Sequence, residues 1–240
     1  MKEQFQRSAL LVGQEALEIL ASSHVAIFGL GGVGGSAALA LVRAGVTHFD
    51  LVDDDVFSLS NLNRQSLSSL SEVGRAKVDV AEERLMAINS DITVVKHRLF
   101  YLPGNQGDID FSSFDYVVDA LDTVAAKLEI AKKAKKAGVP LISALGCGNR
   151  LDPTKIKIGD IFETQGDPLA RVLRRELRKN GIKELKVVYS TEIPLKPISP
   201  LGEALPPGKK SIPGSSPFVP PAAGLALAYE VCRELTSKGK

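Results

Sequence analysis

The feature that most constrains the fold is a glycine-rich turn between an apolar segment and a segment of helical pattern. The turn, GLGGVG at residues 29–34, follows the apolar run His24–Phe28 and leads into Val33–Ala44. Its spacing matches GxGxxG, in which glycine permits a tight turn and close approach of a phosphate, while the helix N-terminus supplies oriented N–H groups. This strand–turn–helix unit predicts a nucleotide site. The glycines expected to hold the nucleotide are Gly29, Gly31, Gly32 and Gly34.

Strand-like and helix-like segments alternate through the first 150 residues, which is typical of a parallel sheet covered on both faces. The strands are expected at residues 24–28, 49–52, 92–95, 116–118 and 139–142. The helices are expected at residues 33–44, 72–88 and 124–137, with Ser71 as the N-cap of the second. We therefore predict an α/β fold with a Rossmann-like, mostly parallel sheet and helices on both faces.

The pattern changes after residue 150. Asp167 is expected to cap a helix that has Pro168 in its first turn. Residues 194–221 hold most of the chain's 13 prolines and predict a long mobile crossing loop. The other elements expected here are strands at 156–161 and 185–191 and a last helix at 222–235. The predicted domain spans 1–240, with a nucleotide-binding core (24–150), a C-terminal part (151–193 and 222–240) and the loop (194–221).

Charge and composition exclude several classes of protein. A formal net charge of +2 and 44% hydrophobic residues allow a large core and show no global preference for nucleic acid. No apolar segment reaches the length of a membrane span. Cys147 and Cys232 form no CxxC pair, which disfavours structural zinc and favours a reducing compartment, expected to be the cytoplasm. The histidines, His24, His48 and His97, show no triad-like grouping and are interpreted as structural or surface residues.

A polar cluster beyond the second expected strand indicates chemistry at phosphate. Arg64 can fork onto phosphate oxygens and Lys77 adds a mobile point charge, and both would stabilise negative charge as pyrophosphate leaves. Taken singly, each member is equally compatible with a solvated loop or a helix cap. The cluster residues are Asn61, Arg64, Gln65 and Lys77.

Acidic residues are expected at the same edge of the sheet. Asp53 and Asp55 follow the second strand, and Asp53 is placed to accept hydrogen bonds from ribose hydroxyls. Asp119 and Asp122 end a later strand. Asp122 would hold the Mg²⁺ that accompanies ATP, whereas Asp119 is equally compatible with a cap or turn. The predicted ligands are therefore ATP and Mg²⁺.

These motifs together resemble those of a known family. GLGGVG, LVDDDVFSLSNLNRQ, VGRAKV and VVDALD are similar to the ThiF-type, ubiquitin-activating-enzyme-like adenylyltransferases. Within that superfamily the chain most resembles the tRNA threonylcarbamoyladenosine dehydratases, through residues 4–8, 141–153, 166–170 and 188–192. The resemblance covers nearly all of the chain outside the proline-rich loop. It implies a homodimer in which Arg7 reaches the partner's ATP phosphates, so that Arg7 joins Arg64, Lys77 and Asp122 as catalytic residues.

The resemblance also implies ATP-dependent dehydration of N6-threonylcarbamoyladenosine in tRNA. ATP would activate the threonine carboxylate as an acyl-adenylate, and the modification's own carbamoyl nitrogen would close the ring with net loss of water. That mechanism depends on binding and positioning rather than on a catalytic cysteine. Whether a sulfur-transfer partner protein assists stays open.

Two other functions remain open from the sequence. One is adenylation of the C-terminal glycine of a ubiquitin-like sulfur-carrier protein, although many such enzymes carry paired CxxC zinc ligands that are missing here. The other is a sensor or scaffold that binds a dinucleotide without turnover. Pyrophosphate release that depends on modified tRNA would separate the three.

A basic stripe on the helix after Asp167 is a candidate tRNA contact. Helical spacing predicts arginines on one face and leucines with Val172 on the other. The stripe would neutralise backbone phosphates without reading bases, and a solvated amphipathic helix explains the same pattern. Lys209 and Lys210 in the expected loop are further candidates. The arginines are Arg171, Arg174, Arg175 and Arg178.

Overall fold

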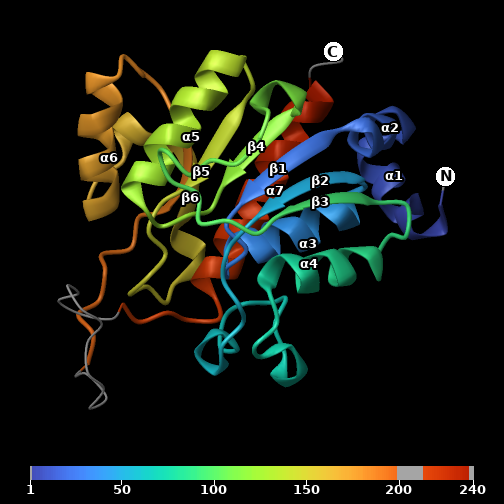
Figure 1. Ribbon diagram of the computed structural model, residues 1–240, viewed down its shortest axis with the longest axis horizontal. Coiled ribbons are helices and arrows are strands. Elements are labelled where there is room, and N and C mark those ends of the chain that lie inside the picture. Colours follow the sequence, from blue (N-terminus) through green and yellow to red (C-terminus); the bar gives the residue numbers. More distant parts are fainter. Residues whose placement is uncertain (1, 199–212, 238–240) are drawn as a thin grey trace.

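One seven-stranded sheet organises the part of the chain that the computed structural model describes, residues 2–198 and 213–237 (Figure 1). The strand order is β3-β2-β1-β4-β5-β7-β6, and all neighbours are parallel except β6 and β7. The strands are β1 (His24–Phe28), β2 (His48–Val52), β3 (Thr93–His97), β4 (Tyr116–Asp119), β5 (Leu141–Ala144), β6 (Ile156–Asp160) and β7 (Lys186–Ser190). The predicted mostly parallel α/β sheet is confirmed.

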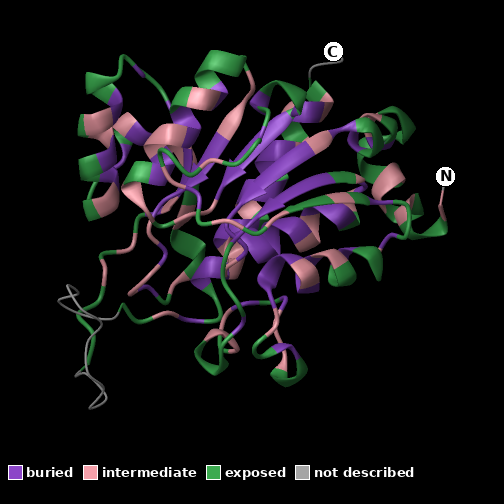
Figure 2. Ribbon diagram, in the orientation of Figure 1, coloured by how far each residue is buried: buried purple, intermediate pink, exposed green. Residues whose placement is uncertain are grey.

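Helices cover both faces of this sheet, as Figure 1 shows. Because successive strand residues point to opposite faces, β1 sends Val25 and Ile27 into one buried cluster and Ala26 and Phe28 into another. The first cluster packs against α3, α4 and α7, and the second packs against α5, so the strands between the edge strands β3 and β6 are largely buried (Figure 2). The helices are α1 (Gln6–Val12), α2 (Gln14–Ser22), α3 (Gly34–Ala44), α4 (Lys77–Met86), α5 (Val124–Ala137), α6 (Pro168–Lys179) and α7 (Val219–Ser237).

The helix predicted at 72–88 is shorter than expected. It is α4, which begins at Lys77, while Leu70–Glu72 forms a separate 3-10 turn. Ser71 lies inside that turn, so its prediction as an N-cap is wrong. Gly74, at a φ of +88°, separates the two elements, because this left-handed backbone cannot continue a helix. Strands β3 and β5 also begin slightly later than predicted.

The last helix begins earlier than predicted. α7 starts at Val219, so residues 219–221 are helical and do not belong to the crossing loop. Pro220 and Pro221 are tolerated there because the N–H groups of a first helical turn have no acceptor within the helix. Gly224 lets α7 lie directly on α3, since a Cβ there would collide with the carbonyl oxygen of Val33.

The described ends of the predicted loop meet at Asn149, which has a φ of +59°. Its N–H donates to the Gly214 oxygen (2.7 Å), and Gly214 N–H donates to Asn149 Oδ1 (2.6 Å). The Asn149 carbonyl also accepts a hydrogen bond from Leu195 N–H (2.7 Å). The two described ends of the loop are therefore held by hydrogen bonds to Asn149, whereas the sequence predicted that they would be mobile. Residues 199–212, with Lys209 and Lys210, lie outside the described residues.

Two histidines share one aspartate on the sheet face that α5 covers. His24 Nε2 lies 2.7 Å from Asp50 Oδ1, and His97 Nε2 lies 2.5 Å from Asp50 Oδ2. His24 Nδ1 lies 3.1 Å from the Ser113 carbonyl oxygen, so both of its nitrogens face acceptors, an arrangement that favours the protonated ring. Sequence reasoning did not predict this His–Asp–His grouping, but it includes no nucleophile, and the structural interpretation of the two histidines stands. Among residues 2–198 and 213–237, no helix has the length and apolar character to cross a bilayer.

Candidate nucleotide site

The glycine turn lies at the carboxyl end of β1, between β2 and β4, where the strand order changes direction. Open α/β sheets bind ligands at such switch points. Gly29 has a φ of +92°, and a Cβ there would lie 2.9 Å from the Ala120 carbonyl oxygen. Gly31 differs, because a Cβ there would meet nothing closer than Gln65 Nε2 at 3.9 Å. The missing side chain of Gly31 therefore leaves open space where the phosphate is expected.

Asp53 ties this turn to the end of β2. Its Oδ2 accepts a hydrogen bond from Leu30 N–H (2.6 Å), and its Oδ1 accepts one from Asp55 N–H (2.9 Å). Burial raises the pKa of the Asp53 carboxyl, and the nearby Lys77 opposes that shift. Asp53 therefore shapes the turn in the absence of any ligand, and its contact with ribose stays a prediction.

Lys77 reaches the same place from the first turn of α4. The residue is only 5% exposed, and its Nζ donates to Asp55 Oδ2 (2.7 Å) and lies 3.7 Å from Asp53 Oδ1. The Asp55 side chain is 65% exposed. An ion pair with one solvated partner contributes little to stability, so an incoming phosphate can replace Asp55 beside Lys77.

Arg64, Asn61 and Gln65 come from the 3-10 turn Leu59–Asn61 and the residues that follow it. Arg64 Nη1 donates to Ser60 O and to Asn63 Oδ1 (both 2.8 Å), and no carboxylate of the described residues lies within ion-pair distance of it. Gln65 is buried, and its Oε1 has no hydrogen-bond partner in the described part of the chain. The cluster thus presents a cation, Arg64, that no carboxylate of the described residues neutralises.

The two aspartates that follow β4 have different surroundings. Asp122 is exposed at the rim, whereas Asp119 is fully buried. Asp119 Oδ2 accepts hydrogen bonds from Lys127 Nζ (3.0 Å) and Ser143 Oγ (2.5 Å), and its Oδ1 accepts one from Leu121 N–H (3.1 Å). The alternatives left open for Asp119 are thereby resolved in favour of a structural role. Lys127 was missed, because nothing in its sequence context separates it from the other lysines of α5.

The glycine turn, the polar cluster and the aspartates other than Asp119 line one cavity of about 400 Å³. It brings together all the residues predicted to bind the nucleotide except Gly34, which lies behind the turn because a Cβ there would collide with Gly29. The predicted residues that line it are Gly29, Gly31, Gly32, Asp53, Asp55, Asn61, Arg64, Gln65, Lys77 and Asp122.

The cavity is also lined by residues that were not predicted from the sequence. They are Leu99, Phe100 and Tyr101 after β3, Cys147 and Gly148 after β5, and Ser215 and Pro220. Carboxyl ends of parallel strands meet at one edge of a sheet, so the strand order was a usable signal for the first two groups. No local signal marks the third group, which reaches the cavity through the contacts of Asn149.

Comparison with known proteins identifies the family. The ThiF family model matches residues 5–188, well over half of the chain. The chain belongs to the ThiF family. A Bacillus subtilis relative named tRNA threonylcarbamoyladenosine dehydratase is 40% identical over 243 residues, which covers 98% of this chain and 95% of that protein. An Escherichia coli relative of the same name is 35% identical over 206 residues, covering 82% and 77%.

A solved structure supports the same placement in the ThiF family. It is the E. coli tRNA N6-threonylcarbamoyladenosine dehydratase in complex with ATP, with a TM-score of 0.86 and 29% identity. It covers 99% of this chain and 95% of the solved chain, and the same protein has been solved with AMP. The resemblance read from the sequence motifs is thus confirmed.

Arg7 of this ThiF family member does not join the cavity of its own chain. It is exposed on α1, which precedes β1 and lies at the amino-terminal edge of the sheet (Figure 1). The cavity lies at the opposite, carboxyl-terminal edge. Any contact between Arg7 and a nucleotide therefore requires a second chain.

The predicted arginine stripe on α6 is only partly available. Arg174 Nη1 donates to Thr164 O (2.9 Å), Thr164 Oγ1 (2.6 Å) and Ile161 O (3.2 Å), so this residue anchors α6. The Arg178 guanidinium lies 4.9 Å from the centre of the Phe162 ring. Val172 is 40% exposed and not part of the buried face, which consists of Ala170, Leu173 and Leu177.

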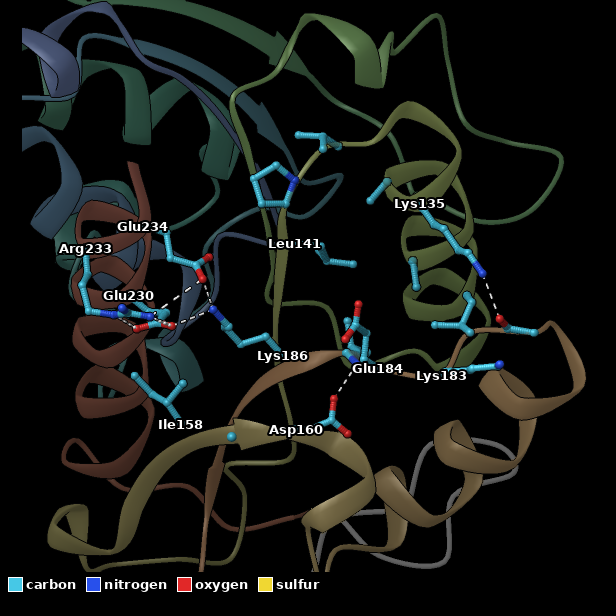
Figure 3. Close-up of a pocket in the computed structure, with 18 residues that line it drawn as sticks. Lys135, Leu141, Ile158, Asp160, Lys183, Glu184, Lys186, Glu230, Arg233 and Glu234 are labelled. Carbon is cyan, nitrogen blue, oxygen red and sulfur yellow. Dashed lines mark hydrogen bonds and ion pairs between the residues drawn. The ribbon is translucent and has the colours of Figure 1, made fainter. Parts of the chain in front are cut away.

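A larger hollow, of about 1010 Å³, lies at the amino ends of β5 and β7 (Figure 3). Some of its charged groups pair with one another: Lys186 lies 2.8 Å from Glu230, and Arg233 lies 2.7 Å from the same carboxylate. Lys186 also pairs with Glu234. The smaller cavity stays the candidate nucleotide site, because it contains the glycine turn and Arg64, which has no carboxylate partner among the described residues.

Proposed function

We propose that this protein catalyses the ATP-dependent dehydration of N6-threonylcarbamoyladenosine in tRNA, with the nucleotide in the cavity at the carboxyl end of β1. One observation carries the proposal: the glycine turn, an Arg64 without a carboxylate partner in the described residues, and a Lys77 with an exchangeable one face the same cavity. Similarity to relatives named tRNA threonylcarbamoyladenosine dehydratase over nearly the whole chain supports the substrate.

The residues of the cavity fit ATP with Mg²⁺. Gly31, Gly32 and Val33 line the cavity directly before α3 begins at Gly34, so a phosphate bound there would lie near the amino end of that helix. No group of three metal-ligating side chains occurs in the described residues, but Mg²⁺ bound with ATP takes only one or two carboxylates beside the phosphates. Asp122, exposed at the rim, would be such a carboxylate. When bound, Mg²⁺ neutralises phosphate charge.

Arg64 and Lys77 would supply most of the transition-state stabilisation. An oxygen of the threonine carboxylate attacks the α-phosphorus, pyrophosphate leaves, and the two cations stabilise the charge that moves onto it. The carbamoyl nitrogen then attacks the activated carbonyl carbon and loses its proton, and AMP leaves. ATP becomes AMP and pyrophosphate, while the modified nucleoside loses the elements of one water molecule.

The chain need not provide a nucleophile for this reaction. Cys147 lines the cavity, but burial raises the pKa of its thiol to about 11, so the thiol stays protonated near neutral pH. A protonated thiol is a poor nucleophile. The substrate's own nitrogen therefore closes the ring, and the protein acts through binding and positioning.

The proposal extends to a homodimer in which Arg7 of one protomer reaches the ATP of its partner. The distance between α1 and the cavity of the same chain supports this arrangement. Leu10 and Leu11 on α1 are 86% and 88% exposed, and a second copy would cover them. We also propose that residues 1–240 form one adenylation domain, because α7 and β7 complete the core and sheet that hold the cavity.

We propose that tRNA contacts α6 through Arg171, Arg175 and Arg178, which are exposed. Arg174 is withdrawn from that set, since its guanidinium is used within the fold. The substrate would place the protein in the cytoplasm. A sulfur-transfer protein remains a predicted partner, with no contact surface assigned to it.

The decisive experiment combines tRNA that carries N6-threonylcarbamoyladenosine with the purified protein, ATP and Mg²⁺. We expect pyrophosphate release, and mass spectrometry of the nucleosides should show the loss of one water from the modified adenosine. Unmodified tRNA is the matched control and should release none. Release with a ubiquitin-like carrier protein and none with modified tRNA would overturn the proposal in favour of carrier adenylation.

A further inference from the structure

The charge of this protein is distributed unevenly between the two faces of its sheet. The whole chain has a formal net charge of only +2. The helices α5 and α6, which share a buried cluster on one face, carry ten lysines and arginines and two carboxylates. The helices α3, α4 and α7, which pack against the other face, carry four lysines and arginines and five carboxylates. The positive charge is therefore concentrated on the side of α5 and α6, which lie next to each other in Figure 1.

Most of these cations are not used by the fold. Lys127 and Arg174 are the exceptions, because acceptors of the fold surround each of them. The ion pairs of Glu129 and Glu176 all join cations of their own helix, and exposed pairs of this kind contribute little to stability. Two carboxylates cannot neutralise the eight cations that remain on the two helices.

The exposed cations of α5 lie away from the nucleotide cavity. Ala126, in the first turn of α5, lines the cavity, whereas Lys132, Lys135 and Lys136 are exposed in the carboxyl half of the helix. At 1.5 Å per residue, these lysines lie about 9–15 Å along the helix from Ala126. Lys135 Nζ donates to the Gly181 carbonyl (2.8 Å) just beyond α6, so the carboxyl ends of the two helices meet.

Helix α6 continues the same surface. Its N-cap, Asp167, lies 3.6 Å from Arg150 in the segment after β5, and part of that segment lines the cavity. Arg171, Arg175 and Arg178 are exposed along the helix. Both helices therefore begin near the cavity and carry exposed cations away from it. We call this region the α5–α6 surface, and its residues are Lys132, Lys135, Lys136, Arg171, Arg175 and Arg178.

The position of this surface restricts the chemistry of its partner. A nucleotide held in the cavity does not extend to the lysines of α5. A distance of about 9–15 Å corresponds to roughly three to four nucleotides of a stacked strand, at about 3.4 Å per nucleotide. An RNA chain supplies a phosphate at each of these steps, and lysines and arginines bind such phosphates without reading the bases.

We propose that the α5–α6 surface binds the phosphate backbone of an RNA whose reacting base lies at the nucleotide cavity. Lys132 and Lys136 hold phosphates several nucleotides away from that base. The inference rests on the proposed function, and it adds α5 to an RNA site that otherwise consists of α6 alone. Recognition of the substrate then extends beyond the modified nucleoside.

Charge reversal on α5 tests the proposal in the full-length protein. Lys132→Glu with Lys136→Glu should weaken the binding of intact tRNA about tenfold and make the slope of log affinity against log salt less steep by about 1–2. Filter binding over a salt series measures both quantities. The KM for modified tRNA should rise while kcat and ATP affinity stay unchanged, because neither lysine touches the cavity.

Two further variants control for net charge and for folding. Arg43→Glu with Arg84→Glu makes the same change of charge on α3 and α4, on the other face of the sheet, and should bind tRNA as the wild type does. Lys132→Arg with Lys136→Arg keeps the charges and should also bind normally. If the charge reversal lowers Tm to the assay temperature, Lys132→Gln with Lys136→Gln replaces it.

A short RNA tests the distance. A single strand of about four nucleotides around the modified adenosine is too short to reach Lys132 and Lys136 from the cavity. The wild type and the α5 variant should therefore bind this strand equally, although they differ for intact tRNA. An equal loss for both RNAs would place the lysines at the reacting base and overturn the proposal.

The other outcomes are also distinct. Unchanged tRNA affinity in the α5 variant would overturn the proposal, as would an equal loss in the variant of α3 and α4. Weaker binding of an acidic ubiquitin-like carrier protein, with tRNA binding intact, would instead assign the surface to a protein partner. If tRNA binds with the expected salt dependence but modified tRNA is not converted, the proposed reaction fails and the RNA surface stands.

Discussion

Lys77 and Lys127 are the two buried lysines of the described residues, and each lies beside an aspartate at the carboxyl end of a parallel strand. Lys127 is enclosed: Nζ donates to Asp119 Oδ2 (3.0 Å), Ser143 Oγ (3.0 Å) and the Ala144 carbonyl (2.7 Å), which uses its three protons. Lys77 faces a cavity, and its main partner, Asp55, is largely solvated. The same pair of residue types thus has a structural role at Lys127 and Asp119, and lines the candidate phosphate site at Lys77 and Asp53.

The difference lies in what surrounds each ammonium group. A buried charge needs all its hydrogen bonds satisfied, and Lys127 has them from three acceptors on the two neighbouring strands β4 and β5, so that no ligand can improve its surroundings. Lys77 has one short contact and one long one, so a phosphate can displace Asp55 at little cost. Burial alone therefore does not distinguish Lys77 from Lys127, whereas the number of satisfied protons on each ammonium group does.

The largest expected effect is on stability, at the buried pair of Lys127 and Asp119. Lys127→Met should lower the free energy of unfolding by about 3–5 kcal/mol, because Asp119 is left as an uncompensated buried charge. Urea denaturation measures this change. The double variant Lys127→Met with Asp119→Asn should recover part of the loss. A change below about 1 kcal/mol in the single variant would contradict the contrast between the two lysines.

The next largest effect is expected at Lys77, and it should appear in the rate of pyrophosphate release. Lys77→Met should slow pyrophosphate release by about 100- to 1000-fold, since it removes a cation aimed at the charge of the transition state. Its effect on unfolding should be smaller than that of Lys127→Met. Lys96→Met is a matched control, because Lys96 pairs with Asp79 and Glu82 on the surface, and this variant should keep the wild-type rate.

The same contrast can be tested on α6, where Arg174 is used by the fold and Arg171 is not. Charge reversal at Arg171 and Arg175 should weaken tRNA binding about tenfold and make the slope of log affinity against log salt less steep by about 1–2. Arg174→Ala should instead lower Tm and leave that slope unchanged. Filter binding over a salt series measures both variants, and an unaltered slope after the charge reversal would remove α6 from the tRNA site.

The smallest expected effect is the pH dependence of the His24–Asp50 contact. The hydrogen bond to Asp50 raises the pKa of His24. Burial alone would raise the pKa of Asp50, but hydrogen bonds from His24 and His97 outweigh it, and the pKa is lowered. The His24 contribution is therefore complete below pH about 6.5 and is lost as pH rises through its raised pKa. The Asp50 contribution is complete above pH about 3.9 and is lost as pH falls through its lowered pKa.

The near-isosteric variant Asp50→Asn checks this pH window. Its deficit in unfolding free energy, measured in urea, should be larger at pH 5.5 than at pH 8.5, by about 1 kcal/mol. An equal deficit at both values would show that His24 is not held as an imidazolium.

Much of the fold and half of the site could be predicted because local patterns encode them. The glycine spacing around Gly31 and the polar cluster at Arg64 are contiguous in the chain, and the sheet edge that joins them follows from parallel topology. The differences fall where one backbone position or a neighbouring turn, which periodicity does not record, decides the outcome. Ser71 is not the cap, because Gly74 interrupts the predicted helix. The Arg174 guanidinium is used within the fold, because the turn at Thr164 lies beside it.

What the sequence by itself determined is the family, the parallel sheet and the set of residues around the phosphate, because each is written in short motifs with fixed spacing. Only the tertiary structure decided which charges remain available. Lys127, Asp119 and Arg174 are satisfied by partners on other elements of the fold, while Arg64 has no carboxylate partner among the described residues. The physical reason is that hydrogen-bond satisfaction is a property of three-dimensional neighbours, and a linear pattern records residue types without recording which of their protons and lone pairs are already used.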